Sequence, residues 1–126
     1  MKILLAEDDL NIATIAKLSL AQIGGHEVDH AKDGEEALQM ALSAKYDVIL
    51  LDEMMPKMSG PDMCKKYITT AKELSPIIFM SANARKVDEV GLPDGAIGFI
   101  AKPFDPTRLA QEVESLVSTH LQSQAG

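Results

Sequence analysis

The sequence predicts an α/β protein in which a doubly wound, five-stranded parallel sheet carries helices on both faces. Short apolar runs alternate with amphipathic runs along the whole chain. Several of the apolar runs have no polar residue inside them, which is typical of parallel strands buried on both faces. With 126 residues, the chain is long enough for one domain around a hydrophobic core.

The first half of the chain alternates strand-like and helix-like segments. Strands are predicted at KILLA (2–6), HEVDHA (26–31) and VILLD (48–52), and helices over 11–23 and 35–44. Apolar residues recur at helical spacing before Gly24, which ends the first helical run. Asp33, followed three residues later by Glu36, is typical of a capping box at the start of the second helix.

The second half continues the same alternation. Strands are predicted at PIIFMSA (76–82) and AIGFIAK (96–102), and helices over roughly 60–74 and from Pro106 onward. Ser59 and Asp62 open the first of these helices, with Pro61 tolerated in its first turn. Asp105 caps the last helix, and Pro106 begins it.

Right-handed crossovers leave few topologies for five such strands, and the flavodoxin-like order 2-1-3-4-5 is the common one. The chain shows no internal repeat, linker or low-complexity block. We therefore expect one domain over residues 1–120 and a frayed C-terminal tail over residues 121–126.

Composition argues against several classes of function. The formal net charge of −7 disfavours nucleic acid as a direct ligand, because phosphate binding requires clustered lysines and arginines. No apolar run approaches the roughly 20 residues of a membrane span, and nothing resembles a signal peptide. Cys64 is the only cysteine, so no intramolecular disulfide can form. We expect a cytoplasmic protein with no membrane contact.

Acidic residues follow the first and third predicted strands. In open α/β sheets, ligands bind beyond the carboxyl ends of the strands, at the point where the strand order reverses. For the order 2-1-3-4-5, that point lies between the first and third strands, so Glu7, Asp8, Asp9 and Asp52 should converge. Such a cluster needs a cation, and a set of oxygen ligands favours Mg²⁺.

The remaining strand ends add complementary groups. Ser81 places a hydroxyl at the end of the fourth strand, and Lys102 places a cation at the end of the fifth. A single aspartate at a strand end is usually a cap or turn residue, and Asp9 fits that role. Four functional groups at the correct ends of four strands indicate phosphoryl transfer, in which an aspartate becomes an acyl phosphate.

Several strings of the sequence resemble the receiver domain of bacterial two-component response regulators, in particular its single-domain, CheY-like or relay-type members. The matching strings, in family order and spacing, are ILLAEDD, GHEVDHAKDGEEAL, DEMMPKMSG, IIFMSA and FIAKPF. The resemblance covers residues 2 to about 119. Its most specific part is D-x-x-M-P-x-x-x-G, from Asp52 to Gly60.

The resemblance implies a role for each residue of the site. Asp52 matches the phosphoacceptor, and Lys102 and Ser81 match the residues that contact the phosphoryl group. The implied Mg²⁺ ligands are Asp8 and Asp52 directly, Glu7 through a water molecule, and Met54 through its backbone carbonyl. Phe99 matches the aromatic switch residue that responds to Ser81. The Lys102–Pro103 peptide is expected to be cis.

The implied partner is a histidine kinase or a histidine phosphotransfer protein, which donates a phosphoryl group to Asp52. The resemblance then implies that the domain is not an enzyme and catalyses only its own phosphorylation and dephosphorylation. No output domain follows in this sequence, so output is expected through contact with a downstream protein. An excised receiver of a larger response regulator or hybrid kinase is the alternative.

Two other classes share parts of this pattern. A mononucleotide binder of the flavodoxin type needs a phosphate loop after the first strand, where this chain has acidic residues that repel phosphate. A phosphatase of the aspartyl-phosphate type has a second aspartate two residues after its nucleophile, where this chain has Met54.

The resemblance also implies that Met54 and Asn83 flank the acyl phosphate and should influence its lifetime.

One segment departs from the family pattern. In RKVDEVGLPDGAIGF, Gly91 and Pro93 interrupt the region where many receivers carry a full fourth helix. We therefore expect this helix to be short or irregular, which puts family-standard output contacts in question.

Overall fold

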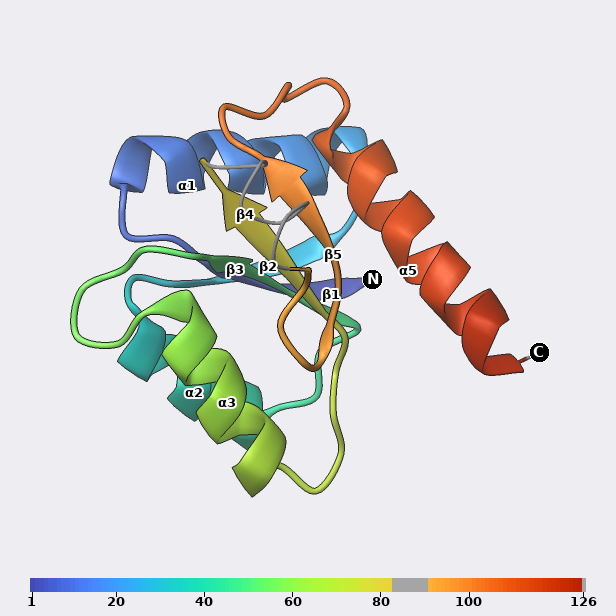
Figure 1. Cartoon of the computed structure of the whole chain (residues 1–126). Coiled ribbons are helices and arrows are strands. Elements are labelled where there is room, and N and C mark those ends of the chain that lie inside the picture. Colours follow the sequence, from blue (N-terminus) through green and yellow to red (C-terminus); the bar gives the residue numbers. More distant parts are fainter. Residues whose placement is uncertain (83–90, 126) are drawn as a thin grey trace.

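One parallel sheet organises the molecule, and its strands run in the order β2-β1-β3-β4-β5 (Figure 1). The computed structural model describes residues 1–82 and 91–125. In chain order, the strands are β1 (Lys2–Ala6), β2 (Glu27–Ala31), β3 (Val48–Asp52), β4 (Ile77–Ser81) and β5 (Ala96–Ala101). All the pairings between neighbours are parallel, so the predicted flavodoxin-like doubly wound fold is confirmed.

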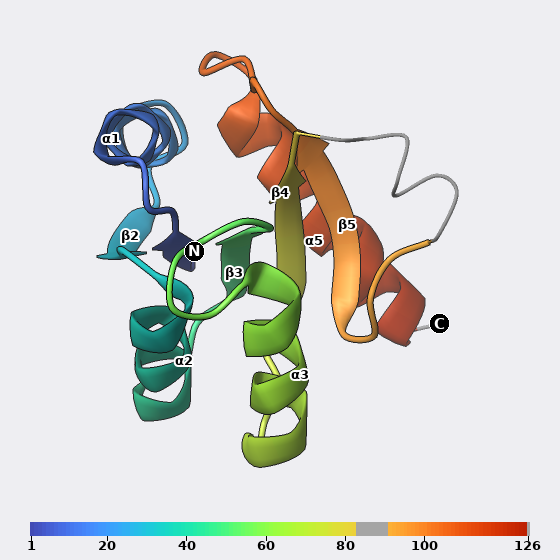
Figure 2. The same ribbon diagram turned by 60° about the vertical axis from the view of Figure 1, so that its left-hand side comes forward.

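Helices cover both faces of this sheet. They are α1 (Leu10–Leu18), which continues as the π-helical segment Ser19–Ile23, and α2 (Gly34–Ser43), α3 (Gly60–Thr70) and α5 (Leu109–Ala125). Helices α1 and α5 pack on one face, and α2 and α3 pack on the other (Figure 1 and Figure 2). No helix in the described part of the chain is both long and apolar enough to cross a membrane.

Two separate hydrophobic clusters lie on the two faces, and the central strands contribute to both. In β3, Leu50 packs in the cluster under α1 and α5, whereas Ile49 and Leu51 pack in the cluster under α2 and α3. Successive side chains of a strand point to opposite faces, so each residue of a central strand needs an apolar side chain. This two-sided burial explains why β3 and β4 contain no polar residue before their ends.

Short polar side chains begin three of the helices. Asp9 accepts hydrogen bonds from backbone N–H groups in the first turn of α1. Asp33 accepts from the Glu36 N–H at 2.8 Å, and the Ser59 hydroxyl accepts from the Asp62 N–H at 3.3 Å. The predicted starts of α2 and α3 are therefore confirmed, since the capping oxygens satisfy N–H groups that have no helical partner.

Helix α3 ends at Thr70, four residues before the predicted end. The Tyr67 hydroxyl explains the difference, because it accepts a hydrogen bond from the Ser75 N–H at 2.8 Å and lies 3.4 Å from the Glu73 carbonyl oxygen. These contacts hold the connecting loop against the end of the helix. Pro76 then directs the chain into β4, since a proline disfavours a helical conformation in the preceding residue.

Helix α5 begins at Leu109, later than the predicted start at Pro106. The Asp105 carboxylate accepts hydrogen bonds from the N–H and hydroxyl groups of Thr107, which stabilises a turn that leads directly into the helix. At its other end, α5 continues to Ala125, through most of the tail that we expected to fray.

The expected irregular fourth helix falls mainly on residues 83–90, outside the part of the chain that the structure describes. Asn83 lies in the same range. Gly91 and Pro93, which led to that expectation, belong to no helix or strand.

Gly60 allows the loop after β3 to return close to the end of that strand. Its N–H donates a hydrogen bond to the Glu53 carbonyl at 3.0 Å. A Cβ atom on Gly60 would overlap the carbonyl oxygen of Asp52 and lie 3.1 Å from the Cα atom of Glu53. Because both neighbours are backbone, a side chain here would displace the end of β3.

We predict that Gly60→Ala lowers the free energy of unfolding by about 3 kcal/mol, because the methyl group overpacks a rigid backbone contact. Urea denaturation measures the change. Gly25→Ala is the control: Gly25 has a φ of +70° and no neighbour within 4 Å of its Cβ position. That variant should lose only about 1 kcal/mol. Equal losses in the two variants would contradict the close-approach explanation.

Candidate functional site

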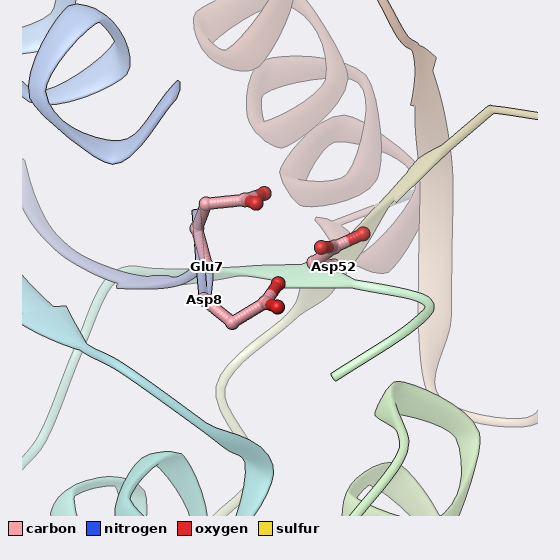
Figure 3. Close-up of side chains that lie close together, drawn as sticks. All are labelled: Glu7, Asp8 and Asp52. Atoms are coloured by element: carbon pink, nitrogen blue, oxygen red, sulfur yellow. The ribbon is translucent and has the colours of Figure 1, made fainter. Parts of the chain in front are cut away.

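Three carboxylates meet at the carboxyl ends of β1 and β3. Glu7 and Asp8 directly follow β1, and Asp52 ends β3, which pairs with β1 through Ala6 and Leu51. One carboxylate oxygen from each of the three acids lies within 4.8 Å of the others (Figure 3). The strand order therefore brings together acids that are far apart in the sequence, at the edge where the sequence predicted their convergence.

The three acids differ in their exposure to solvent. Glu7 is 1% exposed and Asp52 is 6% exposed, whereas Asp8 is on the surface. The Glu7 N–H donates to the Ala31 carbonyl of β2 at 3.0 Å, and its carboxylate accepts a bond from the Asp9 N–H at 3.2 Å. The cluster is therefore held by the sheet from behind and opens to solvent on the side of Asp8.

Lys102 bridges two of these acids. Its Nζ atom lies 3.0 Å from Oε2 of Glu7 and 3.3 Å from Oδ2 of Asp52, and its side chain is 16% exposed. The Lys102 N–H also donates to the Ser81 carbonyl at 2.8 Å, which places the lysine beside the end of β4. The Lys102–Pro103 peptide is cis, as the resemblance implied.

The ionisation of the site follows from burial and from these contacts. Burial raises the pKa of Glu7 above its ordinary value of 4.5; the hydrogen bond from Lys102 offsets part of this effect, and the charge of Asp52 adds to it. Burial alone would lower the pKa of Lys102. The hydrogen bond to Glu7 and the charge of Asp52 outweigh burial and raise that pKa above 10.5, so Lys102 is a cation at neutral pH.

The Ser81 hydroxyl lies at the same edge of the sheet, and its partner was missed by the sequence analysis. Ser81 is 1% exposed, and its Oγ atom donates a hydrogen bond to Oε2 of Glu53 at 2.7 Å. Asp52 pairs with Met80, so the next residue of each strand, Glu53 and Ser81, lie side by side. The predicted strand order placed β3 beside β4, but only the register seen in the structure brings Glu53 opposite Ser81.

Phe99 and Met54 occupy different surroundings. Phe99 pairs with Phe79 across β4 and β5 and is half-buried against the cluster under α2 and α3. A surface depression of about 320 Å³ lies beside it, lined by residues of β5, of α5 and of the turn before α5. Met54 is 80% exposed and is a member of neither hydrophobic cluster.

The donor set fits a hard divalent cation. Glu7, Asp8 and Asp52 offer carboxylate oxygens close to one another, and Lys102 supplies only one compensating positive charge. Carboxylate oxygens, with no thiolate or imidazole among them, match Mg²⁺ in both charge and ligand type. An additional cation would relieve the remaining repulsion between the acids.

A parallel sheet with helices on both faces, with a cluster of carboxylates and a bridging lysine at the carboxyl ends of its strands, is typical of a phosphoacceptor domain of the receiver type. A family model described as the response regulator receiver domain matches residues 3–114, and the chain belongs to this family. Receiver domains are phosphoacceptor signalling domains that bind Mg²⁺ at an acidic site and interact with histidine kinases or phosphotransfer proteins.

Two similar proteins are bacterial response regulators. The chain is 37% identical over 117 residues to the alkaline phosphatase synthesis transcriptional regulatory protein PhoP of Bacillus subtilis, covering 92% of this chain and 48% of that protein. It is also 37% identical over 117 residues to the response regulator ArlR of Staphylococcus saprophyticus, covering 92% of this chain and 52% of that protein. The chain thus spans about half the length of these relatives.

Several solved receiver structures are similar along nearly their whole length. The Francisella response regulator 1452 receiver domain has a TM-score of 0.82 and 32% identity, over 94% of this chain and 98% of that one. The chemotaxis response regulator CheY4 of Vibrio cholerae has a TM-score of 0.81 and 31% identity, over 91% and 97%. The receiver domain of sensor histidine kinase PA1611 from Pseudomonas aeruginosa, with a TM-score of 0.81 and 29% identity over 93% and 97%, has a magnesium ion in its active-site cleft.

The raised pKa of Glu7 predicts a pH dependence of stability in metal-free protein. The folded state binds this proton more tightly than the unfolded chain does, so the stabilising contribution of Glu7 is complete below pH 4.5. It is lost as the pH rises through the raised pKa. Glu7→Gln cannot ionise and should therefore gain stability relative to wild type as the pH increases from 4.5 to neutrality.

Urea denaturation of both proteins in EDTA at a series of pH values measures this difference. A difference in unfolding free energy that stays constant across the range would show that burial does not raise the pKa of Glu7.

Proposed function

We propose that this chain is the phosphoacceptor domain of a two-component or phosphorelay system, with Asp52 as the acceptor. The observation that carries the proposal is the position of the Asp52 carboxylate, which lies 3.3 Å from Lys102 and beside Glu7 and Asp8. A strand buried on both faces supports Asp52 from behind, which holds a reactive side chain in a fixed geometry.

In the proposed reaction, a carboxylate oxygen of Asp52 attacks the phosphorus of a phosphohistidine on a histidine kinase or phosphotransfer protein. The phosphorus–nitrogen bond breaks, its electron pair stays on the imidazole, which takes up a proton, and Asp52 becomes an acyl phosphate. Lys102 is already within 3.3 Å of Asp52 and can neutralise charge on the transferred oxygens.

The acids beside Asp52 fit the metal that such transfer uses. Asp8 and Asp52 would bind Mg²⁺ directly, Glu7 through a water molecule, and Met54 through its backbone carbonyl. When bound, Mg²⁺ would neutralise negative charge on the phosphoryl oxygens. Lys102 would keep the buried Glu7 carboxylate paired throughout.

Phosphorylation would signal through Ser81 and Phe99. The phosphoryl group adds negative charge and acceptor oxygens within reach of the Ser81 hydroxyl. Movement of Ser81 toward these oxygens would open space for the half-buried Phe99 ring to turn inward. The surface of β5 and α5 would then favour one of two packings, as a population shift.

The proposed receiver comprises residues 1–120, with residues 121–126 as its C-terminal tail, and acts in the cytoplasm. Its own phosphorylation and dephosphorylation are the only reactions that we assign to it. Because similar response regulators are about twice as long, a CheY-like stand-alone receiver and a receiver within a longer regulator or hybrid kinase both fit. For a stand-alone receiver, we expect output by contact with another protein.

We predict that acetyl phosphate labels the wild-type protein once per chain in the presence of Mg²⁺ and does not label Asp52→Asn, which lacks the acceptor oxygen. Phosphate-affinity gel electrophoresis measures the labelled fraction. Asp62→Asn, at an exposed position in the first turn of α3, is the matched control and should label like the wild type.

An equal shift in wild type and Asp52→Asn would remove Asp52 from this role. Continuous turnover of p-nitrophenyl phosphate would instead support the phosphatase class.

We also predict that Phe99→Ala keeps the wild-type rate of labelling but loses the conformational response, because the ring packs against the cluster under α2 and α3 and its proposed role is to respond to movement of Ser81. Amide hydrogen exchange of β5, measured before and after phosphorylation, should change in the wild type and stay constant in the variant. The same change in both proteins would exclude Phe99 as the switch.

A further inference from the structure

We propose that Glu53 is a positioning residue that holds the Ser81 hydroxyl while Asp52 is unphosphorylated, and that it competes with the phosphoryl group for this hydroxyl. The inference rests on the proposed phosphorylation of Asp52 and adds a residue that opposes the response to it. It follows from one contact, the 2.7 Å hydrogen bond from Ser81 Oγ to Glu53 Oε2.

The backbone on both sides fixes this contact. The Glu53 N–H donates to the Met80 carbonyl at 3.1 Å, which extends the pairing of β3 and β4 by one residue. The Glu53 carbonyl accepts the Gly60 N–H at 3.0 Å, where no side chain could fit. Glu53 is half-buried and Ser81 is 1% exposed, so the two side chains meet with little competition from water.

The chemistry of a serine hydroxyl makes the two acceptors exclusive. The hydroxyl carries one proton, so it can donate to the Glu53 carboxylate or to a phosphoryl oxygen on Asp52. A bond to a carboxylate is charge-assisted and stronger than a bond between neutral groups. Ser81 must therefore give up a strong partner before it can bind the phosphoryl group.

This competition sets the balance between the two arrangements of Ser81. A ligand shifts such a balance only by its differential interaction with the two states, and Glu53 stabilises the state that precedes phosphorylation. Replacing the carboxylate by a neutral amide weakens the hold on Ser81. A phosphoryl analogue at Asp52 should then bind more tightly, because the Ser81 hydroxyl is more readily available to donate a hydrogen bond to it.

A double-mutant cycle with beryllofluoride, a non-covalent phosphoryl analogue, tests this coupling. The proteins are wild type, Glu53→Gln, Ser81→Ala and the double variant, each titrated with Mg²⁺ present and followed by fluorine NMR. We expect Glu53→Gln to tighten binding roughly tenfold in the wild-type background. In the Ser81→Ala background, the gain should be no more than about twofold, the general effect of removing one charge.

Glu35→Gln removes a charge from an exposed position in the first turn of α2 and should change the affinity by no more than the same factor of about two. Circular dichroism and thermal unfolding confirm that each variant is folded. An equal gain with and without Ser81, or weaker binding by Glu53→Gln, would overturn the proposal. If the wild type neither binds beryllofluoride nor accepts a phosphoryl group, the proposed function itself has failed, which is a different outcome.

Discussion

The contact of Lys102 with Glu7 and Asp52 is the interaction on which the site depends. A buried carboxylate costs several kcal/mol unless it is paired, and here two of them share one ammonium group. The lysine directly follows β5, at the edge of the sheet, whereas Glu7 follows β1 and Asp52 ends β3. The position of Lys102 therefore requires the whole sheet in its correct order, and the site exists only as a consequence of the complete fold.

The sequence predicted the elements that depend on local or periodic patterns. The ends of β1 and β3 agree with the structure, because these strands are apolar on both faces and stop at their first acidic residue or one residue before it. Asp33 and Ser59 begin helices as predicted, since capping involves residues only three positions apart. The convergence of Glu7, Asp8 and Asp52 followed from strand order alone.

The features that the sequence did not predict depend on contacts across the fold. The end of α3 is set by the Tyr67 hydroxyl, whose partners lie in the loop that follows the helix. The Ser81–Glu53 contact joins adjacent strands and depends on the register one residue beyond the end of β3. Neither contact produces a repeating pattern in the sequence. Each joins single residues, and the paths of the connecting loops determine whether they meet.

The uneven exposure of the three acids has a consequence for how the site exchanges with its surroundings. Asp8 lies on the surface, while Glu7 and Asp52 are buried at the end of a sheet that carries a hydrophobic cluster on each face. Small ions and water can therefore enter and leave along the Asp8 side without loosening either layer of helices. The occupancy of the carboxylate cluster by an ion can therefore follow the ion concentration of the solution, while the sheet and its two layers of helices stay unchanged.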